Sequence, residues 1–328
     1  TFLLVDYSCA LKLSSPATYL TAIKAASNQG IVIKGSNSLD EYAQVDTFVF
    51  DKTGTLTTGV PKIQRIIAYE GYDDEEVLRI AACLEEHFYH PIATAVVKKA
   101  EDEGIEHEEM HGKLTHVASK GIVSSIDGKR VVIGSLELLE DEKTIISNEQ
   151  KAVIEEYSQK YNLLYLSYDG KLIAIFLIDT PLRGEAIALL KELKEKGKQI
   201  VLLTGDTQKR TETICSLIPF DRVYTQVKPE QKHQVIEQLQ EEGHHVLMIG
   251  DGINDSAALS LANVGIVMAG ASDIARQASD ILFLNEQLTG LEVLENITEQ
   301  LNRQLDANLK HTVGINSFLM GLGLIDVV

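Results

Sequence analysis

Residues 48–57 read FVFDKTGTLT, and the rest of the chain is arranged around this stretch. An apolar β-forming run ends at Asp51, and a lysine, a glycine and three threonines follow it. A carboxylate at the end of a strand can attack a phosphoryl group and carry it as an acyl phosphate. Lys52, the threonine hydroxyls and the backbone N–H of Gly54 would supply positive charge and hydrogen-bond donors. The stretch therefore predicts a phosphate-handling loop with Asp51 as its nucleophile.

Strands and helices alternate regularly after residue 179, which predicts a parallel sheet with crossover helices. Helices are expected at 183–196 and 230–242, and strands at 199–203, 246–249, 264–268 and 281–284. The first of these strands runs into Thr204-Gly205-Asp206, and the second runs into residues 250–255, GDGIND. The carboxyl ends of parallel strands converge on one crevice. These two segments are therefore expected beside Asp51.

A shared crevice would hold the three parts that phosphoryl transfer needs, namely a nucleophile, a metal and fixed hydrogen-bond donors. Lys232, at the start of a predicted helix, would bring a cation to Asp51 and the phosphate. The full set of catalytic candidates is Asp51, Lys52, Thr53, Thr204, Gly205, Asp206, Lys232 and Asn254. Mg²⁺ prefers hard oxygen ligands, and the candidate magnesium ligands are Asp51, Thr53, Asp251 and Asp255.

The segment between the phosphate loop and the regular α/β part has a different character. Helical spacing appears at 74–86, 92–103 and 149–161. Asp127-Gly128 and Asp169-Gly170 lie between β-rich runs and predict hairpins. Residues 62–169 are therefore expected to form an inserted α+β domain with its own core.

Thr53 separates two classes of enzyme. Phosphatases of the haloacid dehalogenase type carry a second Asp two residues after the nucleophile, where it acts as general acid and base in hydrolysis of the acyl phosphate. A threonine at this position cannot do that proton chemistry. The phosphoenzyme of this chain is therefore expected to persist, as a coupled conformational cycle requires.

With these motifs in place, the chain resembles the P-type ATPases. The resemblance rests on DKTGTLT (51–57), DTPLR (179–183), TGD (204–206) and GDGIND (250–255). It implies a haloacid-dehalogenase-like, Rossmann-like phosphorylation domain with a parallel sheet, split by an inserted nucleotide-binding domain. It also implies ATP and Mg²⁺ as cofactors.

The insertion is similar to that of the heavy-metal (CPx-type) subfamily. His90-Pro91 resembles its His-Pro motif, whose histidine contacts the adenine region of ATP. Gly121 matches one glycine of its Gly-x-Gly pair, whereas Ser119 stands where the other glycine is expected. The nucleotide-binding candidates by resemblance are Glu86, His90, Pro91 and Gly121.

The amino end resembles the membrane segment that binds the transported metal in this subfamily. Of its Cys-Pro-Cys motif only Cys9 is present, because Tyr7 and Ser8 replace the first two residues. A single thiolate is a less soft site than two. Asn316 falls where copper pumps carry an asparagine and zinc pumps a lysine, so the ion is left open. An inert buried thiol is the alternative for Cys9.

Composition narrows the partners and the location. The formal net charge of −18 over 328 residues argues against a general nucleic-acid binder, which needs a basic surface. Three widely separated cysteines give neither a disulfide framework nor a zinc pattern, so a reducing compartment is expected. Both ends read as pieces of membrane segments. The chain is therefore expected to be a fragment of a multi-pass membrane protein, with most of its length in the cytoplasm.

The sequence thus predicts the catalytic part of an ATP-driven pump for a transition-metal cation, working through an aspartyl phosphate. The expected domains are 1–35 (remnant of a metal-binding membrane helix and linker), 36–61 with 170–290 (phosphorylation), 62–169 (nucleotide binding) and 291–328 (helical tail and start of the next membrane helix). The expected partners are ATP, the metal cation, the membrane and the actuator domain of the parent pump. Three alternatives stay open: a soluble phosphatase of the same superfamily, a P-type pump for a different cation, and a nucleotide-binding regulatory module.

Overall fold

The protein is described by a computed structural model covering residues 6–325 apart from 70, 107–109, 119 and 251; of residues 6–13, 253 and 319–325 the backbone alone is described. The chain divides into two compact units. The first unit comprises the residues up to Leu56, Arg183–Gly205 and Cys215 onward, and the second comprises Thr57–Leu182 and Asp206–Ile214. Each unit is described by itself.

The first unit is built on a seven-stranded sheet. Its spatial order is β1 (Ile31–Ile33), β13 (Ile281–Phe283), β12 (Val264–Val267), β11 (Val246–Gly250), β2 (Thr47–Asp51), β9 (Gln199–Leu203) and β10 (Arg222–Tyr224). Every pair is parallel except β1 with β13. The α/β class and the parallel sheet predicted from the sequence are confirmed.

The strand β2 lies in the middle of this sheet, between β11 and β9, and all five of its residues are buried. A strand buried on both faces needs a continuous apolar run, which Phe48, Val49 and Phe50 supply. Val49 packs into the core formed with the helices α9 (Lys232–Glu241) and α10 (Ser256–Leu261). Because side chains alternate along a strand, Phe48 and Phe50 face the other side, where Phe48 also meets the ring of Tyr42. This packing fixes where Asp51 emerges.

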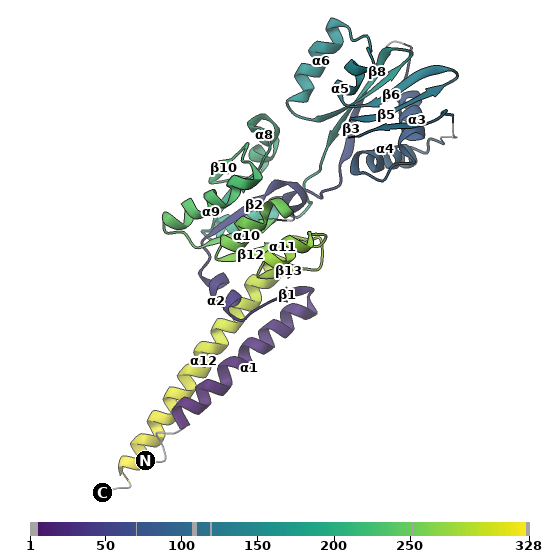
Figure 1. The fold of residues 1–328 in the computed structure, drawn as a ribbon. Coiled ribbons are helices and arrows are strands. Elements are labelled where there is room, and N and C mark those ends of the chain that lie inside the picture. The colour runs from purple at the N-terminus through teal and green to yellow at the C-terminus, as the bar shows by residue number, and fades with distance from the viewer. Residues whose placement is uncertain (1–5, 70, 107–109, 119, 251, 326–328) are drawn as a thin grey trace. The chain divides into compact units, whose positions relative to one another are not determined.

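The helices of the first unit surround its sheet or extend from it (Figure 1). They are α1 (Asp6–Asn28), α2 (Asn37–Gln44), α7 (Ala186–Glu195), α9 (Lys232–Glu241), α10 (Ser256–Leu261), α11 (Asp273–Ala278) and α12 (Gly290–Ile325), while α8 (Gln208–Leu217) is divided between the two units. The first helix packs along the last one. The helix expected at 230–242 starts as a single 3₁₀ turn, Pro229–Gln231, so Lys232 opens α9. Among the described residues, no helix is both long and apolar enough to cross a membrane.

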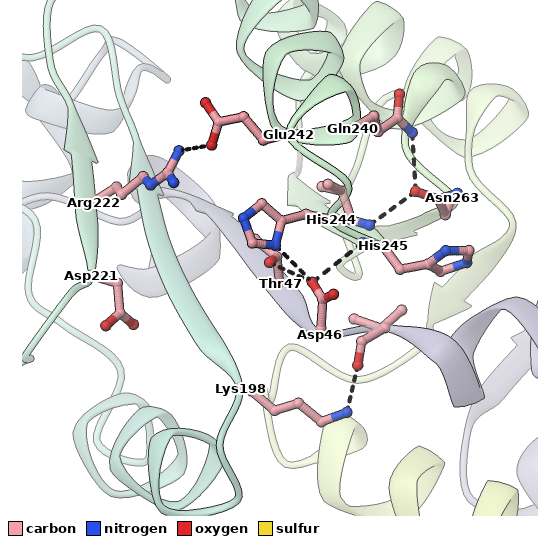
Figure 2. Close-up of polar contacts among 12 residues, drawn as sticks. Asp46, Thr47, Lys198, Asp221, Arg222, Gln240, Glu242, His244, His245 and Asn263 are labelled. Atoms are coloured by element: carbon pink, nitrogen blue, oxygen red, sulfur yellow. Dashed lines mark hydrogen bonds and ion pairs between the residues drawn. The ribbon is translucent and has the colours of Figure 1, made fainter.

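Polar side chains pin the amino edge of the same sheet (Figure 2). Asp46, just before β2, accepts hydrogen bonds from the Thr47 hydroxyl at 2.6 Å and the backbone N–H of His245 at 3.3 Å. Asn263 accepts from the backbone N–H of Val246 at 2.9 Å and from the Gln240 amide at 3.0 Å. These contacts fix where β2 and β11 begin, and therefore also the position along the sheet at which both strands end.

The second unit contains a six-stranded antiparallel sheet. Its order is β3 (Lys62–Ala68), β8 (Lys171–Asp179), β7 (Asn162–Tyr168), β6 (Lys129–Gly134), β5 (Gly121–Ile126) and β4 (Thr115–Val117). The helices α3 (Asp74–Glu85) and α4 (Pro91–Asp102) pack on one face, and α5 (Leu136–Asp141) and α6 (Asn148–Ser158) pack on the other. The insertion therefore has two apolar cores of its own.

The division of the chain differs from the boundary expected at 169/170. β8 pairs with both β7 and β3, so residues 171–179 lie in the second sheet. A hairpin cannot be divided at its turn without exposing the backbone hydrogen bonds of both strands. The segment 206–214 also groups with the second unit, because Arg210 donates a hydrogen bond of 2.9 Å to the Asn162 side chain.

The chain enters and leaves the second unit along one antiparallel ladder. The backbone N–H of Arg183 donates to the carbonyl of Leu56 at 2.9 Å. Thr57 and Leu182 form an isolated antiparallel bridge, and the N–H of Thr58 donates to the carbonyl of Pro181 at 3.0 Å. The two connecting segments are therefore paired with each other rather than running as separate loops.

Candidate active site

Asp51 is the last residue of β2 and is only 6% exposed. Its register partner on β9 is Leu203, so Thr204 continues from the neighbouring strand end. Thr204 is also buried, and its backbone N–H and carbonyl are held by Tyr224 and Val227. The parallel pairing thus brings Asp51 and Thr204 to one edge of the sheet, as their positions at strand ends predict.

The loop after Asp51 is an irregular helical turn over Lys52–Leu56. Gly54 has a φ of +73°, a conformation that side chains with a Cβ rarely adopt. Thr53 is exposed, whereas Thr55 is fully buried, and the Thr55 hydroxyl has no hydrogen-bond partner among the described residues. A buried hydroxyl without a partner is costly unless a ligand satisfies it. The loop therefore carries a donor suited to an incoming oxygen atom.

Lys232 lies between two carboxylates. Its ammonium nitrogen is 2.6 Å from Oδ1 of Asp51 and 2.6 Å from Oδ1 of Asp255. All three residues are nearly buried, at 6%, 6% and 2% exposure in the order Lys232, Asp51, Asp255. Burial alone lowers the pKa of the Lys232 ammonium, but the two carboxylates outweigh it and the pKa is raised. The lysine is therefore a permanent cation at the candidate nucleophile.

Asp255 owes its position to a glycine at the end of β11. A Cβ on Gly250 would lie 2.7 Å from Oδ2 of Asp255, closer than the two atoms can approach. The backbone N–H of Asp255 donates to the carbonyl of Gly252 at 3.2 Å. The glycines of the 250–255 segment thus let the carboxylate of Asp255 fold back against the strand end.

Arg183 fixes the phosphate loop from the other side of the sequence. This buried guanidinium donates to the carbonyl of Thr55 at 2.7 Å and to that of Gly54 at 2.8 Å, and a third donor reaches the carbonyl of Glu286. A planar fork of donors suits several fixed carbonyls at once. In the sequence Arg183 is only the last residue of DTPLR (179–183), whereas the structure identifies it as the residue that holds the loop.

The remaining candidates are placed less directly. Lys52 is half-buried, and Gly205 and Asn254 are exposed. Asp206 belongs to the second unit. Asp251 lies outside the described residues, so its expected position beside Asp51 stays a prediction. Cys9 is part of α1, and the structure describes its backbone but not its side chain.

The donor set fits the expected Mg²⁺. Carboxylates are ligands that Mg²⁺ prefers, usually one or two of them together with water and substrate phosphate. Asp51 and Asp255 are two buried carboxylates at one strand edge, and the same loop contains the unsatisfied Thr55 hydroxyl. One lysine countercharge between two carboxylates leaves the group anionic, which favours a further cation.

The second unit has a pocket of about 370 Å³. This volume lies in the range of small-molecule sites. Its lining includes one glycine from each of two neighbouring strands, two histidines, a lysine and a buried carboxylic acid. These residues are Glu85, His90, His116, Lys120, Gly121 and Gly134. The pocket therefore contains His90 and Gly121, two of the four nucleotide-binding candidates. Ser119 lies outside the described residues.

His90 is the N-cap of α4, and Pro91 is the first residue of that helix. Nδ1 of His90 accepts a hydrogen bond of 3.2 Å from the backbone N–H of Ala93. The ring proton is therefore on Nε2, which lies 3.5 Å from Oε2 of Glu85. Burial, followed by the charge of His116, lowers the pKa of His90. The imidazole is thus held neutral, with its Nε2 proton on the side of the ring nearer Glu85.

Glu85 lines this pocket, whereas Glu86, the residue expected to contact ATP, is not among the lining residues. The Glu85 side chain is 2% exposed, and burial raises its pKa to about 7. Its Oε2 makes no hydrogen bond within the described part. The signal was available in the sequence, because Glu85 continues the buried face of α3 after Leu78 and Ala81, at intervals of three and four residues.

Gly121 and Gly134 let two strands approach unusually closely beneath the pocket. A Cβ on Gly121 would lie 2.2 Å from the carbonyl oxygen of Ile133, and one on Gly134 would lie 2.2 Å from that of Lys120. The two glycines face each other across β5 and β6 as register partners. The sequence indicated Gly121, while Gly134 became apparent only through this pairing.

Known proteins resemble this chain in sequence and in fold. A family model described as haloacid dehalogenase-like hydrolase matches residues 45–263. Over 311 residues the chain is 33% identical to a silver exporting P-type ATPase of Salmonella typhimurium, a match that spans 94% of this chain and 37% of that protein. The chain spans about a third to a half of the length of the curated relatives it matches.

Two solved structures give the same result. A zinc-transporting PIB-type ATPase in an E2·Pi state superposes with a TM-score of 0.84 at 26% identity, covering 98% of this chain and 52% of that one. The catalytic domain of a CPx-ATPase, described as changing conformation upon nucleotide binding, superposes with a TM-score of 0.67 at 29% identity, covering 84% of this chain and 98% of that one. The resemblance inferred from the motifs is confirmed: the chain belongs to the haloacid dehalogenase-like hydrolase family and is homologous to the catalytic part of heavy-metal-exporting P-type ATPases.

Proposed function

We propose that the chain is the ATP-binding and phosphorylation part of a pump for a transition-metal cation. ATP binds in the pocket of the second unit, and its γ-phosphoryl group is transferred to Asp51. The observation that carries this proposal is the buried Lys232 ammonium, 2.6 Å from both Asp51 and Asp255 at the strand edge. A structural ion pair alone would not account for an unsatisfied Thr55 hydroxyl in the same loop.

The residues divide the work of phosphoryl transfer. A carboxylate oxygen of Asp51 forms the new bond to phosphorus as the bond to the β-phosphate oxygen breaks, and ADP leaves. Lys232 keeps Asp51 ionised and opposes the charge on the transferring group. Thr55 and Thr204 are proposed as donors to the phosphoryl oxygens. Mg²⁺ held by Asp51 and Asp251, with Thr53 and Asp255 in support, would neutralise phosphate charge.

In the second unit, His90 and Glu85 are proposed to bind the base of the nucleotide. The neutral His90 presents its Nε2 proton to the pocket, and Glu85, with a pKa of about 7, is partly protonated near neutral pH. A carboxylic acid and an imidazole of this kind can pair with ring nitrogens and amino groups without a net charge. Gly121 and Gly134 line the pocket, and a Cβ on either glycine would force β5 and β6 apart there.

A soluble phosphatase is the second candidate, and Thr53 disfavours it. The Thr53 side chain is exposed and offers no group that can act as general acid or base near neutral pH. Water attack on the acyl phosphate would then be slow. If the chain is a soluble phosphatase, it should turn over p-nitrophenyl phosphate rapidly. If it is the catalytic part of a pump, its phosphoenzyme should accumulate.

The cargo is proposed only as a class. The relatives with printed substrates export silver, copper, zinc or manganese, so they agree on a transition-metal cation and not on one ion. We propose that a longer parent protein supplies the membrane path and an actuator domain that returns Asp51 to its free state. ATPase activity of that parent across a panel of metals would identify the ion, and indifference to all transition metals would remove the heavy-metal assignment.

The test is whether the 328-residue chain takes up phosphate from ATP that stays attached after an acid quench. Incubation with γ-labelled ATP and Mg²⁺, followed by an acid quench, should label the chain, and hydroxylamine should release the label because it cleaves acyl phosphates. Asp51→Asn should abolish labelling. Asp127→Asn, in a hairpin turn of the second unit, is the matched control and should label normally.

Two outcomes would contradict the proposal. Label that resists hydroxylamine, or that persists in Asp51→Asn, would place the phosphate on another residue. ATP binding without any label would favour the regulatory module, in which nucleotide binds and no acyl phosphate forms.

A further inference from the structure

Three side chains with metal-binding atoms meet on the surface of the second unit. Among the residues that the structure describes, Glu86, His87 and His111 form one group whose ligand atoms all lie within 4.8 Å of one another. Nε2 of His87 is 3.0 Å from Nε2 of His111 and 3.4 Å from Oε1 of Glu86. None of the three is among the residues lining the 370 Å³ pocket. The group is therefore separate from the proposed nucleotide site.

The distances match those between ligands of one metal ion. Zinc binds histidine nitrogen at about 2.0–2.1 Å and carboxylate oxygen at about 2.0–2.2 Å. At tetrahedral angles such bonds place neighbouring ligand atoms about 3.3 Å apart. Two separations in the group, 3.0 and 3.4 Å, lie on either side of that value. The third, between Glu86 and His111, is at most 4.8 Å.

His111 is already oriented as a metal ligand. Its Nδ1 lies 2.8 Å from the carbonyl oxygen of Gly112, so Nδ1 carries the proton and Nε2 presents a lone pair. A metal-binding histidine usually donates its other ring N–H to an acceptor such as a backbone carbonyl. This hydrogen bond fixes the tautomer and the ring orientation. The backbone of this segment is also held in place. His111 forms an isolated antiparallel β-bridge with Ile126, and the N–H of Gly112 donates to the carbonyl of Ser125 at 2.7 Å.

Glu86 and His87 come from the end of α3, a second fixed element. The N–H of Glu86 caps that helix on the carbonyl of Ala82 at 2.9 Å. The carboxyl end of a helix carries a partial negative charge, which favours a bound cation. The His87 side chain is 38% exposed, so an ion can reach it from solvent. His87 then needs only to carry its single proton on Nδ1 instead of Nε2, an exchange that solvent allows.

We propose that Glu86, His87 and His111 bind one divalent transition-metal ion of the zinc class. Two imidazoles and one carboxylate are ligands of borderline softness and suit Zn²⁺ better than Mg²⁺ or Ca²⁺, which take oxygen ligands. Three protein ligands leave a fourth position for water. This site does not depend on the proposed phosphorylation chemistry, because it needs neither ATP nor Asp51.

Zinc titration of the 328-residue chain tests the site. The chain competes with a chromophoric chelator for Zn²⁺, and Co²⁺ absorption reports tetrahedral coordination in parallel. His87→Gln and His87→Gln/His111→Gln should weaken this binding at least tenfold, and Glu86→Gln should weaken it less. His244→Gln/His245→Gln, at the amino edge of the other sheet, is the matched control and should leave the site intact. Zn²⁺ should raise the melting temperature of wild type and control but not of the double variant.

The result that overturns the proposal is equally specific. It fails if the His87→Gln/His111→Gln chain binds Zn²⁺ with wild-type stoichiometry and affinity, or if the control loses as much binding as that variant. A single His87→Gln change keeps the test valid if the double variant folds poorly, because His87 is exposed. In that case an unchanged affinity in His87→Gln alone would refute the site.

Discussion

The Lys232 ammonium nitrogen lies 2.6 Å from Oδ1 of Asp51, although 181 positions separate the two residues in the chain. Removing this cation takes away the ammonium that lies between the buried carboxylates of Asp51 and Asp255. We expect Lys232→Met to lose about 3 kcal/mol of folding free energy and to reduce the rate of Asp51 labelling by about 100-fold or more. Chemical denaturation and acid-quenched labelling measure the two effects.

Lys228→Met provides the comparison for that experiment. Lys228 lies four residues earlier on the same segment and is exposed, so its removal should change both quantities little. Equal labelling rates in Lys232→Met and wild type would show that Lys232 stabilises the fold without acting on the phosphoryl group.

Glu85 should make the stability of the second unit depend on pH. Burial raises the pKa of this carboxyl from its usual 4.5 to about 7. Between these two pH values the folded state binds more protons than the unfolded state, so stability falls as pH rises. The contribution of Glu85 is complete below about pH 4.5 and is lost as pH rises through 7. Glu85→Gln, which mimics the neutral acid, should therefore exceed wild type by up to about 3 kcal/mol at pH 8.

The same comparison at pH 4.5 should show no such gain, because wild-type Glu85 is then protonated as well. Glu155→Gln is the control, since it is an exposed glutamate on α6 of the same unit. Melting curves at several pH values give the answer. A gain for Glu85→Gln that does not change with pH would mean that Glu85 acts through packing rather than ionisation.

Arg183 should be necessary for the phosphate loop. Its guanidinium satisfies backbone carbonyls of Thr55, Gly54 and Glu286 in a buried position. Arg183→Met removes the three hydrogen bonds to these buried acceptors, and we expect a loss of about 2–4 kcal/mol together with slower labelling of Asp51. Arg183→Lys cannot supply the planar fork of donors and should recover only part of the loss.

Arg303→Met is the control for that series. Arg303 is exposed on α12 and pairs with Glu299 four residues earlier, an interaction worth about 0.5 kcal/mol or less. If Arg183→Met were as stable as Arg303→Met, the loop would be held by its own hydrogen bonds.

Gly121→Ala should remove nucleotide binding. The added Cβ would meet the carbonyl oxygen of Ile133 at 2.2 Å and Cα of Gly134 at 2.6 Å, so β5 and β6 would have to separate beneath the pocket. We expect the dissociation constant for ATP to rise at least about tenfold, or about 1.4 kcal/mol. Gly35→Ala, which meets nothing within 4 Å, should bind ATP as wild type does. Calorimetric titration measures both.

Much of the first unit could be predicted from local sequence. The strands that end at Asp51, Leu203 and Gly250 are short apolar runs followed by polar loops, and parallel sheets place such ends together. That rule predicts Asp51, Thr204 and Asp255 at one edge of the sheet from the sequence alone. Lys232 followed from the chemistry, because a phosphoryl site between carboxylates requires a cation.

The rest depends on contacts between distant segments. β3 is a strand only because residues 174–179 of β8 pair with it, and nothing in residues 62–68 alone reveals that partner. The choice of Glu86 over Glu85 depended on motif spacing, whereas the buried face of α3 points to Glu85. Arg183 acts through backbone carbonyls, which carry no sequence signal at all.

The ladder joining Thr57–Thr58 to Pro181–Leu182 has a consequence for how the molecule forms. Thr55 and Arg183 are 128 positions apart, and closing a loop of that length costs conformational entropy before β2 can pair with β9. If the second unit folds on its own cores first, its two paired ends lie next to each other. The loop that must then close to form the first unit is much shorter. The insertion would then speed the assembly of the domain that it interrupts.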